Sequence, residues 1–85
     1  MKYFLISDNT DSATGMRLAG VEGVVVSGRE EAIGALRGAS DDPGIGIVLV
    51  TEKICALIED EIEKIRTRDP ECLIVGIPDR HGVGG

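Results

Sequence analysis

The sequence predicts an α/β protein: a three-layer fold in which a four-stranded parallel sheet is joined by three crossover helices. Two observations predict this class. Four short apolar segments rich in Val, Ile and Leu alternate with three segments of helical character, and strands joined by helices imply a parallel sheet with right-handed crossovers. The first and third apolar segments are the most apolar, which places them at the centre of the sheet.

The length of 85 residues suits a single domain. A chain of this size buries about 60% of its surface on folding, enough for one modest core. Aromatic residues make up only 2% of the chain, so aliphatic side chains must build that core. We expect one α/β domain over residues 1–78, followed by a loop-like tail over residues 79–85.

The first half of the chain supplies two strands and the first helix. Residues 3–6 predict a buried strand, and Asn9 follows it as a helix-capping side chain. The first helix is expected to begin near Asp11 and to end at Gly20. Gly15 lies inside it, where glycine is costly, which indicates either a late helix start or a close partner. Residues 23–26 are β-branched and predict the second strand.

Two further helices and two strands complete the pattern. Ser27 and Glu30 have the spacing of a capping box, which opens a second helix that ends near Gly38. Residues 45–50 predict the central strand, and one long helix follows, from residue 51 to residue 70. Its apolar face is spaced at four, four and three residues: Ile54, Ile58, Ile62 and Ile65. Residues 73–77 predict the fourth strand.

The strand order 2-1-3-4 is that of flavodoxin-like and Rossmann-like sheets. In this order the first helix covers one face, and the second and third helices cover the other. We therefore expect an apolar patch on the first-helix face over strands three and four, which is typical of a partner surface. The fourth strand is expected to be an unprotected apolar edge.

Composition excludes several functions. The net charge of −6 and the lack of clustered Lys and Arg disfavour nucleic-acid binding. No apolar run reaches 18 residues, so no membrane span is expected, and the short apolar run at the N-terminus predicts no signal peptide. A cytoplasmic location follows, and Cys55 and Cys72 are expected to be reduced core residues rather than redox or metal groups.

A small acidic crevice is the alternative functional site. Asp8, Asp11 and Glu52 follow the ends of the first and third strands, where such sheets bind ligands, and carboxylates hold divalent cations. The alternative interpretation is therefore a receiver-like signalling domain that binds Mg²⁺ or a phosphoryl group. Thr51 stands where such a domain needs an aspartate.

No other chemistry is indicated. The glycines do not form a dinucleotide-binding or phosphate-binding loop, so no cofactor is expected. An enzyme that uses Cys55 or Cys72 would need an exposed thiol of low pKa, and both cysteines lie in apolar neighbourhoods.

Four segments together resemble a known family. They are YFLISD followed by TGMRLAG near the N-terminus, IGIVLVTEKI, the acidic helix over residues 58–65, and IPDRHG after the last strand. In this order and spacing the chain resembles, from residue 1 to about residue 82, the F subunit of the V-type and A-type (archaeal/vacuolar) ATPases and ATP synthases.

The resemblance implies a function that composition does not. The resemblance implies that the chain is a non-catalytic component of the central rotor stalk in a proton- or sodium-pumping complex. There it would bind the coiled-coil shaft (the D subunit) and other parts of the soluble head, and it would modulate coupling. ATP would be handled by other subunits. The location implied is cytoplasmic and peripheral to the membrane.

The residues expected to contact a partner lie on the first helix and after the last strand: Thr14, Arg17, Leu18, Arg80 and His81. Family members continue past the Ile-Pro segment into a tail that contains a helix, and this sequence is short there. We therefore expect the isolated chain to self-associate through the first-helix face or the fourth strand.

Overall fold

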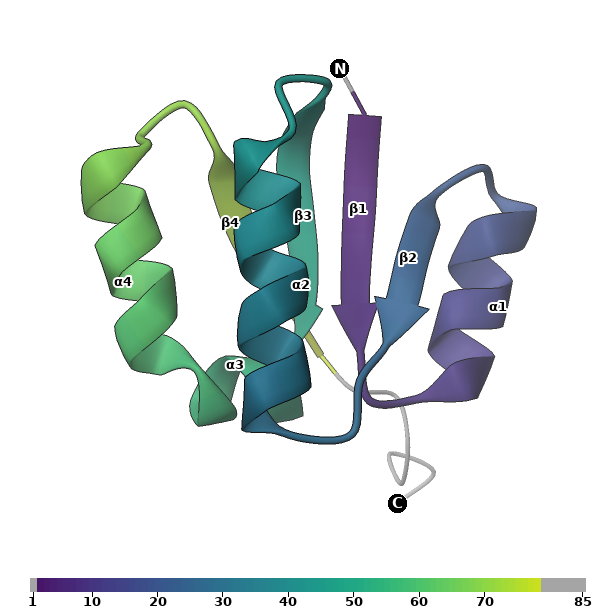
Figure 1. Cartoon of the computed structure of the whole chain (residues 1–85). Helices are drawn as coiled ribbons and strands as arrows, with labels where there is room; N and C mark the ends of the chain where they lie inside the picture. The colour runs from purple at the N-terminus through teal and green to yellow at the C-terminus, as the bar shows by residue number, and fades with distance from the viewer. Residues whose placement is uncertain (1, 79–85) are drawn as a thin grey trace.

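The computed structural model describes residues 2–78 of the chain. Its elements, in chain order, are β1 (Lys2–Ser7), α1 (Thr10–Leu18), β2 (Glu22–Val25), α2 (Arg29–Asp41), β3 (Ile45–Thr51), α3 (Glu52–Leu57), α4 (Glu59–Arg68) and β4 (Leu73–Ile77). The strands form one parallel sheet in the order β2-β1-β3-β4, with all four helices alongside it (Figure 1). The predicted fold class and strand order are confirmed.

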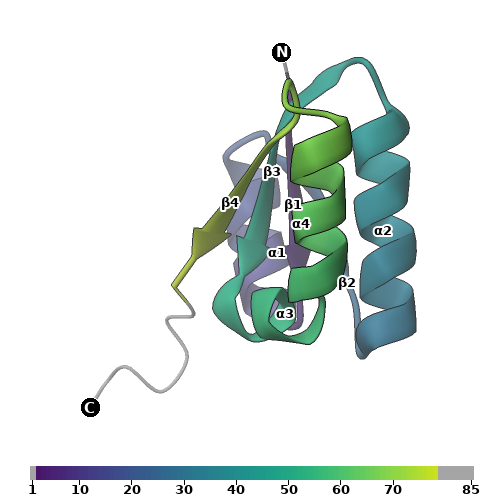
Figure 2. The ribbon, with the colours of Figure 1, turned by 90° about the vertical axis from the view of Figure 1, so that its left-hand side faces the viewer.

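The helices divide between the two faces of the sheet. Helices α2 and α4 cover one face, and α1 lies on the other, as the side view shows (Figure 2). The main core fills the space between the sheet and α2, α3 and α4. The sheet contributes Ile6, Val48, Val50 and Ile74 to it. The helices and the α3–α4 junction contribute Ala32, Leu36, Ala39, Ile54, Ile58, Ile62 and Ile65.

Helix α1 has the predicted ends. The Asn9 side-chain oxygen accepts a hydrogen bond from the Asp11 N–H at 2.8 Å, which satisfies a donor of the first turn. Gly20 has φ +90°, and the Gly20 and Val21 N–H groups donate to the carbonyls of Arg17 and Met16. This is a Schellman ending, in which the left-handed residue is normally glycine.

Helix α2 corrects two predictions. Ser27 does not form a capping box with Glu30; its N–H and hydroxyl instead donate to Glu31 at 2.7 and 2.6 Å. The helix also runs past Gly38 to Asp41. A glycine inside a helix costs about 1 kcal/mol relative to alanine, and the helix continues through Gly38 to Ala39, which is buried in the core.

The long third helix of the prediction is two helices, α3 and α4. The chain breaks at Ile58, which has φ −128° and ψ 28°. Arg29, at the start of α2, holds this break: its guanidinium donates to the Leu57 carbonyl at 2.6 Å and to both carboxylate oxygens of Asp60 at 2.9 and 2.7 Å. Periodicity could not reveal the break, because Ile58 at the junction is itself fully buried.

Candidate partner-binding site

One half of the sheet carries an apolar surface that the described helices leave open. Side chains alternate between the two faces of a strand, so the neighbours of the core residues Val48 and Ile74 point to the α1 side. Helix α1 packs on β1 and β2, and within residues 2–78 no helix lies over β3 and β4 on that side. We call this surface the open sheet face; its residues are Tyr3, Ile47, Leu49, Leu73, Val75 and Ile77.

The open sheet face is exposed to solvent on the outer strand β4 and at Tyr3 of β1. Leu73 is 53% exposed, Tyr3 48% and Val75 44%, while Leu49 between them is half-buried. Leu49 pairs with Val75 on one side and Leu5 on the other, so the apolar row continues from β4 beneath α1. The predicted apolar patch is therefore present, over the two strands for which it was expected.

Three of the predicted contact residues lie on α1, which packs on β1 and β2. Thr14, Arg17 and Leu18 are all exposed, and Leu18 is the most exposed large apolar side chain of the described residues, at 86%. The surroundings of Gly15 are open, because a Cβ added there would meet no heavy atom within 4 Å. Since α1 already begins at Thr10, a late helix start does not explain this glycine.

The other two predicted contact residues, Arg80 and His81, lie outside the described residues. Sequence reasoning did not single out Tyr3, Leu73 or Val75. These residues alternate with buried neighbours along their strands, and this alternation is the signal that could identify them. It shows which residues stay exposed only once the positions of the helices on the two faces are known.

The edge of the sheet at β4 is less open than the sequence indicates. Arg66 of α4 donates a hydrogen bond from its guanidinium to the Ile74 carbonyl at 2.8 Å. This contact occupies a backbone acceptor of the edge strand, and blocking such groups with charged side chains discourages edge-to-edge pairing. The prediction of an unprotected edge is therefore wrong at this position.

The acidic crevice does not gather its three carboxylates. Asp8 accepts a hydrogen bond from the Thr51 hydroxyl at 3.2 Å and lies 3.9 Å from the Lys53 ammonium. Asp11 and Glu52 are exposed on separate helices. Within residues 2–78, no three Asp, Glu, His or Cys side chains are grouped so that they could hold a metal ion.

The cysteines have the environment of structural residues. Burial raises the pKa of the Cys72 thiol, and it also raises that of Cys55 against the opposing effect of Arg66. Cys55 also contacts the Val50 carbonyl through its thiol, at 3.6 Å. A raised pKa keeps a thiol protonated and unreactive at neutral pH, which argues against thiolate chemistry.

These features define a small α/β module with an exposed apolar sheet face. None of the helices described is both long enough and apolar enough to cross a membrane.

Comparison with known proteins gives the family. The family described as ATP synthase (F/14-kDa) subunit matches residues 4–85. The F subunit of the A-type ATP synthase of Methanocaldococcus jannaschii is 35% identical over 83 residues, which are 96% of this chain and 79% of that protein. Its counterpart in Methanothermobacter thermautotrophicus is 40% identical over 73 residues, 85% of this chain and 68% of that protein. The chain therefore belongs to this family of ATP synthase (F/14-kDa) subunits.

Proposed function

We propose that this chain is a non-catalytic component of the central stalk of an A-type ATP synthase, where it binds the coiled-coil shaft (the D subunit) and modulates coupling. ATP would be bound and turned over by other subunits. The location proposed is peripheral to the membrane, on its cytoplasmic side.

The observation that carries this proposal is the open sheet face. Two neighbouring strands span about 10 Å, which is close to the width of one α-helix. A shaft built of helices offers a partner of that width, and its apolar residues would bury Leu73 and Val75. Large exposed apolar patches usually mark such interfaces.

Helix α1, on the same side of the sheet, would add further contacts to this interface. Arg17 and Leu18 would contact the shaft beside the sheet. The small side chain of Thr14 and the absence of one at Gly15 would allow the shaft to approach the backbone of α1 closely. Arg80 and His81 remain proposed contacts that follow β4 in the sequence.

Binding to the purified shaft protein, measured by isothermal titration calorimetry, tests the proposal. A variant that combines Leu73→Thr and Val75→Thr places β-branched residues, which suit a strand, at both positions but removes apolar surface. Loss of two buried apolar side chains should weaken binding by at least about tenfold. Arg17→Ala and Leu18→Ala should each weaken it by a smaller factor.

The matched control is Leu57→Ser, which removes an apolar side chain of similar exposure from outside the open sheet face. It should bind the shaft as the unmodified chain does. Equal affinity of the Leu73 and Val75 variant, or no binding by the unmodified chain, would overturn the proposed interface. The effect on coupling is read from the ATPase rate of the assembled complex with and without the chain.

A further inference from the structure

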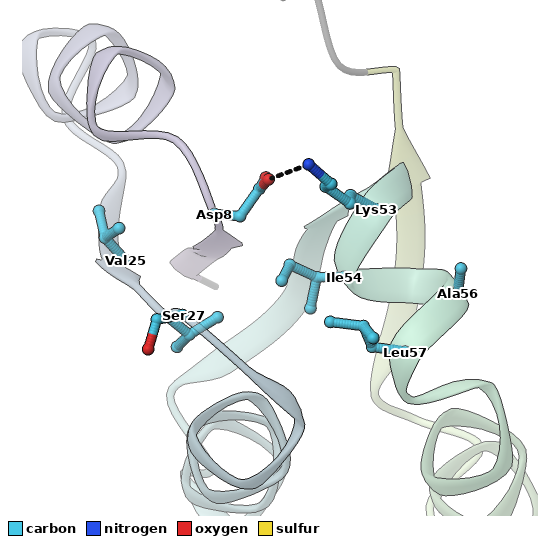
Figure 3. Close-up of a pocket in the computed structure, with 8 residues that line it drawn as sticks. Asp8, Val25, Ser27, Lys53, Ile54, Ala56 and Leu57 are labelled. Carbon is cyan, nitrogen blue, oxygen red and sulfur yellow. Dashed lines mark ion pairs between the residues drawn. The ribbon is translucent and has the colours of Figure 1, made fainter.

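A concave pocket of about 590 Å³ opens at the carboxyl end of the sheet. One wall is the end of β2 and the segment that leads into α2, and the opposite wall is α3 (Figure 3). The pocket is lined by Asp8, Val25, Val26, Ser27, Lys53, Ile54, Ala56 and Leu57. It lies at a different place from the open sheet face, and none of its lining residues belongs to that surface.

The lining combines an apolar floor with two exposed apolar side chains. Ile54 and Val26 are buried at its base, while Val25 is 45% exposed and Leu57 43%. Figure 3 shows Leu57 extending from α3 toward the opposite wall. Exposed apolar side chains on both walls give an entering apolar group contacts on two sides.

The polar groups of the pocket already have partners. Asp8 is held by Thr51 and Lys53, and the Ser27 hydroxyl donates to Glu31. A small-molecule site normally offers a few polar groups that converge on the ligand. Since the polar side chains of the pocket already have partners within the chain, the pocket favours apolar side chains over a polar metabolite.

The surface around the pocket is strongly acidic. All four helices begin at this end of the sheet (Figure 1), and each has carboxylates in its first turn. Within the described part of the chain, five exposed carboxylates there have no ion-pair partner: Asp11, Glu30, Glu31, Glu52 and Glu59. We call this set the acidic ring.

The basic residues near the ring do not neutralise it. Arg29 is paired with Asp60 and Lys53 lies against Asp8, so each cation is matched by a further carboxylate. No other described Lys or Arg lies in the first turn of a helix. The end of the molecule that holds the pocket therefore carries an excess of negative charge.

We propose that this pocket is the docking site for a basic amphipathic helix of a partner protein. One or two large apolar side chains of that helix enter between Val25 and Leu57, and its Lys and Arg side chains face the acidic ring. Helices that place apolar anchors in a groove are a common mode of recognition. Charge complementarity favours a partner helix rich in Lys and Arg, and it raises the rate at which that helix associates with the chain.

The same charge pattern excludes the competing occupants. A second copy of this chain would bring the same acidic ring against it, and like charges facing each other are costly. Nucleic acids and anionic membranes are repelled for the same reason. The proposal does not rest on the proposed function, because it concerns a separate surface.

Nuclear magnetic resonance titration tests the docking site. The isotope-labelled full chain is mixed with a synthetic Leu/Lys amphipathic peptide of about four helical turns. We expect amide shifts at Val25, Ser27 and Ala56, and an affinity that falls severalfold when salt is raised from about 50 to about 200 mM. A peptide of the same pattern with Glu in place of Lys should leave these amides unmoved.

Matched variants separate this site from the open sheet face. Val25→Thr combined with Leu57→Ser should weaken peptide binding by at least about tenfold, while Leu73→Thr with Val75→Thr should leave it unchanged. Glu52→Gln with Glu59→Gln should reduce the salt dependence. Each variant's amide spectrum confirms its fold.

Shifts that map to the open sheet face, or an affinity that the Val25 and Leu57 variant does not change, would overturn the docking site. Binding of the Glu peptide with equal affinity would overturn the charge argument. Because shaft binding is expected to depend on Leu73 and Val75 and not on Leu57, and peptide binding on Val25 and Leu57, failure of one proposal is distinguishable from failure of the other.

Discussion

The side chain of Arg29 connects three helices. It binds the Leu57 carbonyl and both oxygens of Asp60, so one residue at the start of α2 connects to α3 and α4. Exposed ion pairs usually contribute little, but a bidentate geometry with a backbone acceptor fixes position as well as charge. The sequence could not indicate this pairing, since Arg29 and Asp60 are 31 residues apart.

Substitution of Asp60 should change how stability depends on pH. The hydrogen bonds and charge of Arg29 lower the pKa of Asp60 to about 2, below its ordinary value of about 3.9. A lowered folded-state pKa stabilises the fold above the unfolded-state value, and this contribution is lost as pH falls toward 2. Asp60→Asn should therefore be less stable than the unmodified chain at pH 7, with the difference shrinking between about pH 4 and 2.

Urea unfolding at a series of pH values measures that difference. Glu31 and Glu61 also have lowered pKa values, but they are present in both proteins and cancel in the comparison. A difference that stays constant across the whole acidic range would contradict the role given to Asp60.

Gly15 should tolerate alanine with a gain in stability. It is an exposed residue within α1, and a Cβ there meets nothing within 4 Å. Replacing it with alanine should raise the free energy of unfolding by about 0.5–1 kcal/mol. Gly20→Ala is the control and should be destabilising, because φ at Gly20 is +90°. Thermal unfolding of both variants checks the prediction, and a less stable Gly15→Ala would refute it.

At the level of elements, sequence motifs predicted the helix ends that neighbouring residues determine. Asn9 and Gly20 marked the ends of α1 correctly because caps depend on a few neighbouring residues. The capping-box pattern at Ser27 failed because Glu31, one residue further on, takes both of its hydrogen bonds. The break between α3 and α4 was not visible, since its stabilising group comes from α2.

Removal of the Arg29 side chain should loosen the junction between α3 and α4. In Arg29→Ala the Leu57 carbonyl loses its guanidinium donor and Asp60 loses its cation. Amide hydrogen exchange near Ile58 should become faster, by about tenfold or more for the loss of charge-assisted hydrogen bonds. Asp60→Asn keeps the bond to Leu57 and should show a smaller effect; an equal effect would show that the backbone contact does not hold the break.

Across the whole molecule, the sequence predicted where the apolar face would be but not which residues form it. Strand order and helix count were enough to leave β3 and β4 open on one side. The identity of Tyr3, Leu73 and Val75 depends on register, because a shift of one residue exchanges the two faces of a strand. The Arg66 contact with Ile74 likewise required the packing of α4 on β4.

The isolated chain should self-associate weakly through the open sheet face. The net charge of −6 opposes this, so added salt should favour it by screening. Sedimentation equilibrium should give a mass that rises with protein and salt concentration, and Leu73→Thr with Val75→Thr should suppress the rise. A strictly monomeric chain at high concentration would count against this use of the surface.

The order of the strands also sets the order in which the chain can fold. The unit made of β1, α1 and β2 uses only neighbouring segments, so it is available as soon as Val25 has left the ribosome. The other partner of β1 is β3, and Leu5 must wait for Leu49; such distant pairings form slowly. During synthesis, β1 therefore keeps an open, apolar hydrogen-bonding edge until β3 emerges, the interval in which chaperone protection matters most.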